Sequence, residues 1–227
     1  MRMLSASLMM AALAVGQALP ARAAAPDYPP AFPRAGATEV LANSWGTVWD
    51  VTYLPGQPTP MHRHRFDFIG VELADSAVTV TAPDGAAKTF PTRHGESYFL
   101  ARGTTHVEET PAGQPTRHAV IVDLKDVAPA APSPGAFVGD PAAKTVTENA
   151  RMILWDYAWP TRPRPVTVTH NTFIIIVDGG ELTGHGPDGK AYIQTVTSGQ
   201  VLFSPAGATL TAAATRGAVR AVLVELK

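Results

Sequence analysis

The segment AVIVDLK at residues 119–125 recurs as AVLVELK at residues 221–227. Its β-branched and apolar composition is typical of a buried strand. Other short runs of this kind, such as residues 76–81 and 173–177, are followed by Asp-Gly turns, and helical periodicity is hard to find. The run at 173–177 is continuously apolar, so we expect it to be buried on both faces. These features predict an all-β protein.

Two more matches between the halves of the chain keep the same order. VWD at 48–50 matches LWD at 154–156, and PDG at 83–85 matches PDG at 187–189. The offset falls only from 106 to 102 along the chain, as a tandem duplication with short loop deletions predicts. We therefore predict two small antiparallel β-barrels in tandem, packed against each other.

The predicted barrels occupy only part of the 227 residues. Residues 1–23 have the pattern of a signal peptide, with a positive start, an apolar run and an A-x-A cleavage site at 21–23. We assign residues 24–125 to the first barrel, 126–149 to an Ala/Pro/Gly-rich linker and 150–227 to the second barrel. We expect an exported protein, periplasmic or extracellular, with no membrane attachment once the signal is removed.

The amino-acid composition excludes several classes of function. Hydrophobic residues make up 45% and charged residues 16%, which is typical of a globular chain. A net charge of −1 gives no case for nucleic-acid binding. Cysteine is absent from the sequence, which excludes disulfides, thiolate catalysis and Cys-ligated zinc.

A cluster of histidines suggests a metal site. The stretch PMHRHRFD at 60–67 places His62 and His64 two residues apart in a predicted strand, so that both side chains point to one face. A later apolar strand ends in a Gly turn and a third histidine, His106. Three neutral imidazoles on one face are suitable ligands for a transition metal.

These two stretches resemble the paired motifs of the cupin superfamily. The matching residues are Gly56, His62 and His64 in the first motif, and Gly95, Gly103 and His106 in the second. The resemblance implies a bicupin, built from two barrels of the double-stranded β-helix type, and assigns the three histidines to metal-ligand positions. Two departures are that Phe68 and Ile69 stand where the family usually has a glutamate, and that Ala101 replaces a proline.

Asp67 is a further candidate ligand. It lies one residue short of the place of the missing glutamate, and in a regular strand it faces away from His62 and His64, so it requires a bulge to reach a metal. Phe66 and Phe68 share the face of the two histidines, and we expect them to line the same cavity.

The second copy lacks the candidate ligands. Aligning Pro60 with Pro165 places Thr167, Thr169 and Thr172 at the positions of His62, His64 and Asp67, and the Gly turns place Leu210 opposite His106. We therefore predict one metal site, in the first barrel, and a degenerate, metal-free second barrel. Among the other histidines, we interpret His170 as a solvated loop residue, and His94, His118 and His185 as surface residues.

A three-His site leaves coordination positions open for substrate and for water or dioxygen. In the cupin superfamily such a site implies an iron-dependent dioxygenase acting on a small chelating substrate, with Mn, Ni, Cu and Zn as the alternatives to Fe. Two other functions stay open: a non-catalytic small-molecule or metal-binding protein of the cell envelope, and a metal-dependent isomerase, lyase or decarboxylase.

Whether the protein is an enzyme is left open by the sequence, as is a homodimer. The candidates for moving protons besides the ligands are Asp67, Glu72, Tyr98 and Glu108, and we expect Glu108 and Glu109 to be a solvated pair.

Overall fold

The structure, a computed structural model, describes residues 27–127, 140, 142–185 and 190–227. All regular elements among these residues are β-strands, which confirms the predicted fold class. In this part of the chain there is no helix with the length and apolar character needed to cross a membrane. The predicted signal peptide at residues 1–23 lies outside the described residues, and so do residues 128–139 and 141 of the predicted linker.

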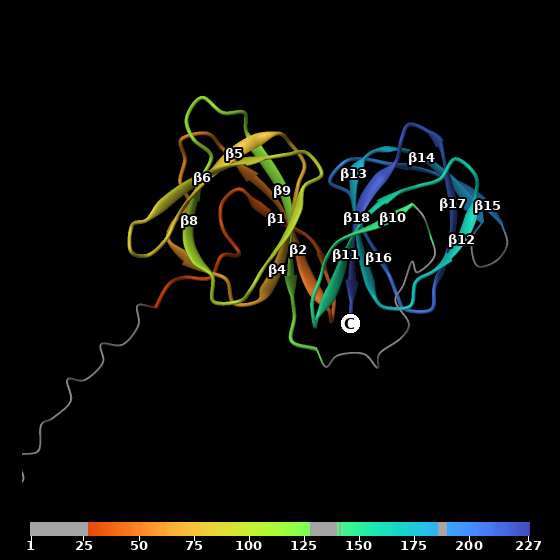
Figure 1. Cartoon of the computed structure of the whole chain (residues 1–227), viewed down its shortest axis with the longest axis horizontal. Helices are drawn as coiled ribbons and strands as arrows, with labels where there is room; N and C mark the ends of the chain where they lie inside the picture. Colours follow the sequence, from red (N-terminus) through yellow and green to blue (C-terminus); the bar gives the residue numbers. More distant parts are fainter. Residues whose placement is uncertain (1–26, 128–139, 141, 186–189) are drawn as a thin grey trace, which may run out of the picture.

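Two barrels lie side by side, the first from red to green and the second from green to blue in Figure 1. In the first barrel, a five-stranded sheet has the order β1 (Ala37–Ala42), β2 (Gly46–Tyr53), β9 (Arg117–Leu124), β4 (Asp67–Glu72) and β7 (Ser97–Leu100). A four-stranded sheet faces it, with the order β3 (His62–Arg63), β8 (Thr105–Glu109), β5 (Ser76–Thr81) and β6 (Ala87–Thr92).

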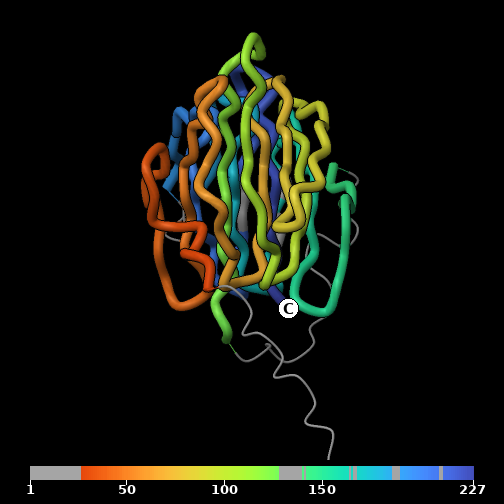
Figure 2. The backbone as a smooth tube through the Cα atoms, turned by 90° about the vertical axis from the view of Figure 1, so that its left-hand side faces the viewer, coloured from red at the N-terminus to blue at the C-terminus, as the bar shows by residue number. Residues whose placement is uncertain are grey.

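The second barrel repeats this arrangement strand for strand. Its five-stranded sheet has the order β10 (Ala143–Glu148), β11 (Met152–Ala158), β18 (Arg220–Leu226), β13 (Thr172–Asp178) and β16 (Val201–Ser204). Its four-stranded sheet has the order β12 (Arg164–Thr167), β17 (Thr209–Arg216), β14 (Gly180–His185) and β15 (Ala191–Val196). Every pairing between named strands is antiparallel, and Figure 2 shows the strands of the first barrel running side by side.

Strand β10 begins inside the segment that the sequence analysis assigned to the linker. Residues 143–148 pair with β11, so the linker does not extend to residue 149 as expected. This strand was not predicted because it lies at the edge of its sheet, where four of its six residues are exposed and do not show the apolar pattern of a buried strand.

The two five-stranded sheets pack against each other between the barrels. Strand β13 shows how this arises from alternation: Phe173, Ile175 and Val177 face the first barrel, while Ile174 and Ile176 face the interior of the second. All five side chains are at most 4% exposed, which confirms that the 173–177 run is buried on both faces. Burial of each such side chain stabilises the fold by about 1.5–3 kcal/mol.

Candidate metal centre

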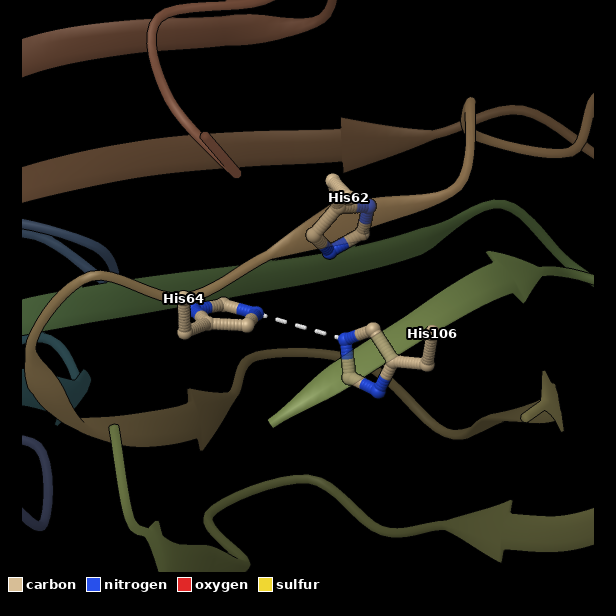
Figure 3. Close-up of side chains that lie close together, drawn as sticks. All are labelled: His62, His64 and His106. Atoms are coloured by element: carbon tan, nitrogen blue, oxygen red, sulfur yellow. Dashed lines mark hydrogen bonds between the residues drawn. The ribbon is translucent and has the colours of Figure 1, made fainter. Parts of the chain in front are cut away.

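The three histidines lie on two paired strands of the first barrel. His62 in β3 is directly opposite His106 in β8. The pairing continues for one more step, because the His64 N–H donates to the Thr104 carbonyl over 2.9 Å. His62 and His64 therefore project from the same face, as alternation along a strand predicted, and Figure 3 shows all three rings converging.

The geometry of the rings is compact. Each residue offers a ring nitrogen, and the three nitrogens all lie within 4.8 Å of one another. His64 Nε2 and His106 Nε2 are 3.3 Å apart. Two nitrogens bound to one metal ion at about 2.1 Å are roughly 3.0–3.4 Å apart, so this spacing needs little adjustment to hold an ion.

The histidines are held in the neutral form that binds metals. Their side chains are 3–5% exposed, and this burial lowers the pKa of His62 and His106 and brings the pKa of His64 to about 3. Neutral His62 donates its Nδ1 proton to the Pro60 carbonyl over 2.9 Å, so its Nε2 lone pair is free. These residues fit a divalent transition metal, and among the described residues no other group of this kind is found.

Asp67 is not part of this cluster, which corrects its candidacy as a ligand. Its pairing with Leu124 starts a register that runs to Glu72 without a bulge, so its side chain points away from the histidines. Its carboxylate accepts a hydrogen bond from the Arg102 backbone N–H over 2.8 Å and forms an ion pair with Arg151 from the second barrel.

The two phenylalanines contact His64 differently. The ring of Phe68 stacks on that of His64, with 3.7 Å between centroids and 12° between planes, and so fixes the orientation of the ligand. Half-buried Phe66 lines a recess of only about 40 Å³ together with His64 and Asp123. The expected aromatic wall therefore lies behind the ligand, and the larger cavity is elsewhere.

That larger cavity, of about 440 Å³, has His106 in its lining. One wall is apolar and the other carries ionisable groups. Its lining residues are Glu72, Val78, Val80, Phe90, Pro91, Thr92, Glu96, Tyr98, Leu100, Thr104, His106, Glu108 and Arg117. A mostly apolar cavity with a few polar groups at one end is the usual form of a small-molecule site.

A buried ion network forms the polar wall. Arg117, which is 1% exposed, binds the Glu72 carboxylate through Nε and Nη2 at 2.6–3.1 Å and the Glu108 carboxylate through Nη1 at 3.0 Å. The Tyr53 hydroxyl donates to Glu108 over 3.0 Å. Burial alone would raise the pKa of Glu108, but the Arg117 charge outweighs it and holds the pKa at about 2.

Glycine at position 70 makes room for the remaining member of the network. Tyr98 is the cross-strand partner of Gly70, and its ring lies over the glycine. A Cβ atom on residue 70 would be 2.2 Å from this ring. The close approach places the Tyr98 hydroxyl 3.0 Å from Arg117 Nη2. Of the predicted proton-moving candidates, Glu72, Tyr98 and Glu108 thus line the cavity, and the expectation that Glu108 is solvated was wrong.

Arg117 was not among the site residues predicted from the sequence. A charged residue at the start of a strand is ordinarily at the surface. No feature of the sequence indicates that the carboxylates of Glu72 and Glu108 lie close to this arginine in the fold. His170 was also misjudged, since it is 4% exposed and its Nδ1 lies 2.7 Å from the Glu225 carboxylate. His94 and His118 are partly exposed and His185 is exposed, as expected for surface residues.

Comparison with known proteins supports the resemblance. No protein-family model matches the chain. Beta-alanine degradation protein BauB of Pseudomonas aeruginosa is 31% identical over 74 residues, which cover 33% of this chain and 77% of that protein. A cupin 2 conserved barrel domain protein from Leptotrichia buccalis is 12% identical and superposes with a TM-score of 0.52, covering 84% of this chain and 88% of its own.

The chain belongs to the cupin superfamily. Oxalate decarboxylase from Bacillus subtilis, a protein with Mn(II) centres, is 11% identical and has a TM-score of 0.50, over 80% of this chain and 69% of its own. The fold of this cupin is a bicupin, with one barrel from each half of the duplication.

The second cupin barrel shows what replaces the ligands. Strand pairing sets Val166 opposite Leu210 just as it sets His62 opposite His106. The same hydrogen bonds that surround His64 surround Val168. The counterparts are therefore Val166, Val168 and Leu210, and Asn171 matches Asp67.

The predicted Thr167, Thr169 and Thr172 were wrong by one residue, whereas Leu210 was correct. The error arose because the alignment was anchored on Pro60 and Pro165, whereas the strand pairing that matches His62 with Val166 makes Arg164 the counterpart of Pro60.

Proposed function

We propose that this protein is an exported, metal-binding bicupin and an oxygenase for a small chelating organic substrate. The observation that carries the proposal is the trio of buried, neutral imidazoles of His62, His64 and His106 beside a cavity of about 440 Å³. A divalent transition metal, with Fe favoured and Mn, Ni, Cu or Zn as alternatives, would be held by these three nitrogens and would supply Lewis-acid and redox chemistry there.

The chain's own residues would position the substrate and manage its protons. The apolar wall of Val78, Val80 and Phe90 suits the hydrocarbon part of a small molecule and excludes water. Ionised Glu108, two residues from His106, is oriented by Arg117 and Tyr53 and can accept a hydrogen bond from a bound hydroxyl group. Tyr98 keeps its proton, because burial raises its pKa, and can donate it to a substrate oxygen.

Dioxygen consumption tests the proposed chemistry. Protein reconstituted separately with Fe(II), Mn(II), Ni(II), Cu(II) and Zn(II) is offered small diketones, hydroxy acids and phenolic acids. We expect oxygen uptake with one metal and one substrate class, abolished in His106→Ala and retained in the matched control His170→Ala. Turnover of a substrate without oxygen uptake would replace the oxygenase proposal with isomerase, lyase or decarboxylase chemistry.

A second candidate function is non-catalytic binding of a small molecule or metal in the cell envelope. It is favoured by the ion pairs that engage both carboxylates of the cavity, since Glu72 and Glu108 share Arg117 and neither is a free base. Tight metal binding with no turnover of any substrate class would select this function.

Export is proposed from the signal-like residues 1–23. Mass spectrometry of protein purified from cells should find the mature N-terminus within a few residues of Ala24. A chain that begins at Met1 would contradict export through cleavage of this segment.

A further inference from the structure

A second arginine of the first barrel, the half-buried Arg34, differs from Arg117 in its hydrogen-bond partners. The guanidinium of Arg34, which precedes β1, lies 5.4 Å from the ring centroid of Phe32 and 4.7 Å from that of Tyr53. Each of these two residues also contacts the site. The Phe32 ring lies edge-on to His64, with 6.3 Å between centroids, and the Tyr53 hydroxyl donates a hydrogen bond to Glu108.

The donors of Arg34 are largely unused. Its Nε and Nη2 atoms are buried and have no hydrogen-bond partner among the residues that the structure describes. Its Nη1 donates to the neighbouring Ala35 carbonyl over 3.3 Å. Burying such donors without partners is unfavourable, and a guanidinium cannot escape by losing its proton. Arg117, by contrast, has acceptors on every nitrogen.

The identity of the two unused donors points to the kind of ligand. Nε and Nη2 form one edge of the guanidinium, and this edge binds both oxygens of a carboxylate in parallel. The nearby rings of Phe32 and Tyr53 restrict the motion of the guanidinium, so little freedom is lost when it binds. The arrangement is a preformed receptor for a planar anion.

Charge in the barrel leads to the same conclusion. Arg34 and Arg117 are balanced by Glu72 and Glu108, and the three imidazoles are neutral. Among these groups, the two charges of a divalent metal would therefore have no counterpart. An anionic ligand would supply one, while a cationic ligand would be repelled.

Resting on the proposed function, we propose that Arg34 is the anion-recognition residue of the metal centre and that the substrate is a carboxylate. The edge formed by Nε and Nη2 would bind the carboxylate group next to the three-His site. A groove of about 380 Å³, lined by Arg34, Tyr53, Gln57 and Thr59 among others, brings solvent to the outer side of Arg34.

Binding of acetate, compared with its neutral analogue acetamide, tests this assignment. Cobalt(II)-loaded protein is titrated with each compound by visible absorption and calorimetry, for the wild type and for Arg34→Met, Arg34→Lys and Arg65→Gln. Arg65 is exposed and lies between β3 and β4, which makes it a matched control.

We expect acetate to bind the wild type and Arg65→Gln equally, and to bind Arg34→Met at least about 10-fold more weakly at the same cobalt content, since a charge-assisted pair is lost. Arg34→Lys should bind acetate with intermediate affinity, because lysine keeps the positive charge but lacks the two parallel N–H donors of the guanidinium. Acetamide should bind all four proteins weakly.

Thermal unfolding separates recognition from a structural role. If Arg34 is a receptor, Arg34→Met should not lower the midpoint of the metal-free protein, and acetate should raise the midpoint only where Arg34 is present. A lowered midpoint with unchanged acetate affinity would overturn the assignment, as would equal binding of acetate and acetamide. If the wild type takes up no cobalt, the proposed function fails, and the acetate-dependent shift of the metal-free proteins then decides the role of Arg34.

Discussion

The two barrels have the same backbone around opposite interiors. In the first, inward-facing positions hold three histidines and the Glu72–Arg117–Glu108 network. In the second, strand pairing places Ile176, Val219 and Ala212 at the positions of Glu72, Arg117 and Glu108, and these side chains are 0–6% exposed. The barrel fold therefore does not require these polar side chains, and we infer that they serve the site of the first barrel.

The difference extends to pairs of residues that depend on each other. Gly70 and Tyr98 face each other in the first barrel, and Ile174 and Leu202 face each other in the second. A small residue beside a large one admits a hydroxyl to the interior, whereas two aliphatic residues of middle size fill the same space with carbon alone. At these positions the second barrel has apolar packing, whereas in the first barrel Tyr98 lines the cavity beside His106.

The largest effect on stability should follow Arg117→Val, which installs the residue of the second barrel at one position only. Glu72 and Glu108 would be left buried without their cation, so we expect a loss of about 3–5 kcal/mol in the free energy of unfolding. Urea denaturation measures this loss. A change below 1 kcal/mol would contradict the account of the network.

A second variant replaces all three members of the Glu72–Arg117–Glu108 network by the residues found at the matching positions of the second barrel. Glu72→Ile, Glu108→Ala and Arg117→Val together reproduce the interior of the second barrel, and such replacements are often neutral or stabilising. We expect the triple variant to be more stable than Arg117→Val alone. Failure of the triple variant to fold would show that the two barrels are not interchangeable at these positions.

Acid should destabilise the metal-free protein through its histidines. The pKa of His64 is about 3 in the folded state and about 6.5 in the unfolded chain, so the unfolded state binds an additional proton between these values. Stability is fully present above pH 6.5 and falls by up to about 1.4 kcal/mol per pH unit below it. His62 and His106 act in the same direction, because their pKa values are lowered too.

His64→Val introduces the residue found at the matching position of the second barrel, Val168. It should reduce the number of protons taken up on unfolding at acid pH by about one, and so make the free energy of unfolding less dependent on pH. Chemical denaturation at several pH values between 4 and 8 measures the slope for both proteins. An identical slope in wild type and variant would mean that His64 is not held neutral by the fold.

Asp67→Asn should leave the metal content unchanged and lower stability by about 1 kcal/mol, because Asp67 joins the barrels through Arg151 and does not face the histidines. Elemental analysis and denaturation of the same sample give both values. Loss of metal equal to that in His64→Ala would make Asp67 a ligand after all.

The smallest effect is expected at the exposed rim between the barrels. His94 Nε2 lies 2.8 Å from Asp178 of the second barrel, and this hydrogen bond raises the pKa of His94. His94→Ala should lower stability by less than about 1 kcal/mol. The contribution should be present below pH 6.5 and lost as the pH rises through the raised pKa, which pH-dependent denaturation of the variant checks.

The sequence predicted the parts of this molecule that repeat or alternate. The matching segments at 119–125 and 221–227 are the central strands β9 and β18, and the spacing of His62 and His64 placed both on one face. A strand pattern indicates which face a residue shares with its neighbours, and this is enough to bring the three histidines together.

The interior charges could not be predicted in the same way. Arg34, Arg117 and Glu108 are residue types that usually lie at the surface. Arg117 and Glu108 are buried with partners at least nine positions away, and Nε and Nη2 of Arg34 have no hydrogen-bond partner among the described residues. The one-residue error in the second motif has a similar cause, because only the hydrogen-bonded register distinguishes Val168 from Thr169.

The metal content of the reconstituted protein tests the contrast between the barrels most directly. We predict one metal ion per chain for the wild type and for His170→Ala. Alanine at His62, His64 or His106 should weaken binding by at least about 10–100-fold, with the thermal midpoint of the metal-free protein preserved. Two ions per chain, or full metal content in the three histidine variants, would contradict the assignment of a single metal site to the first barrel.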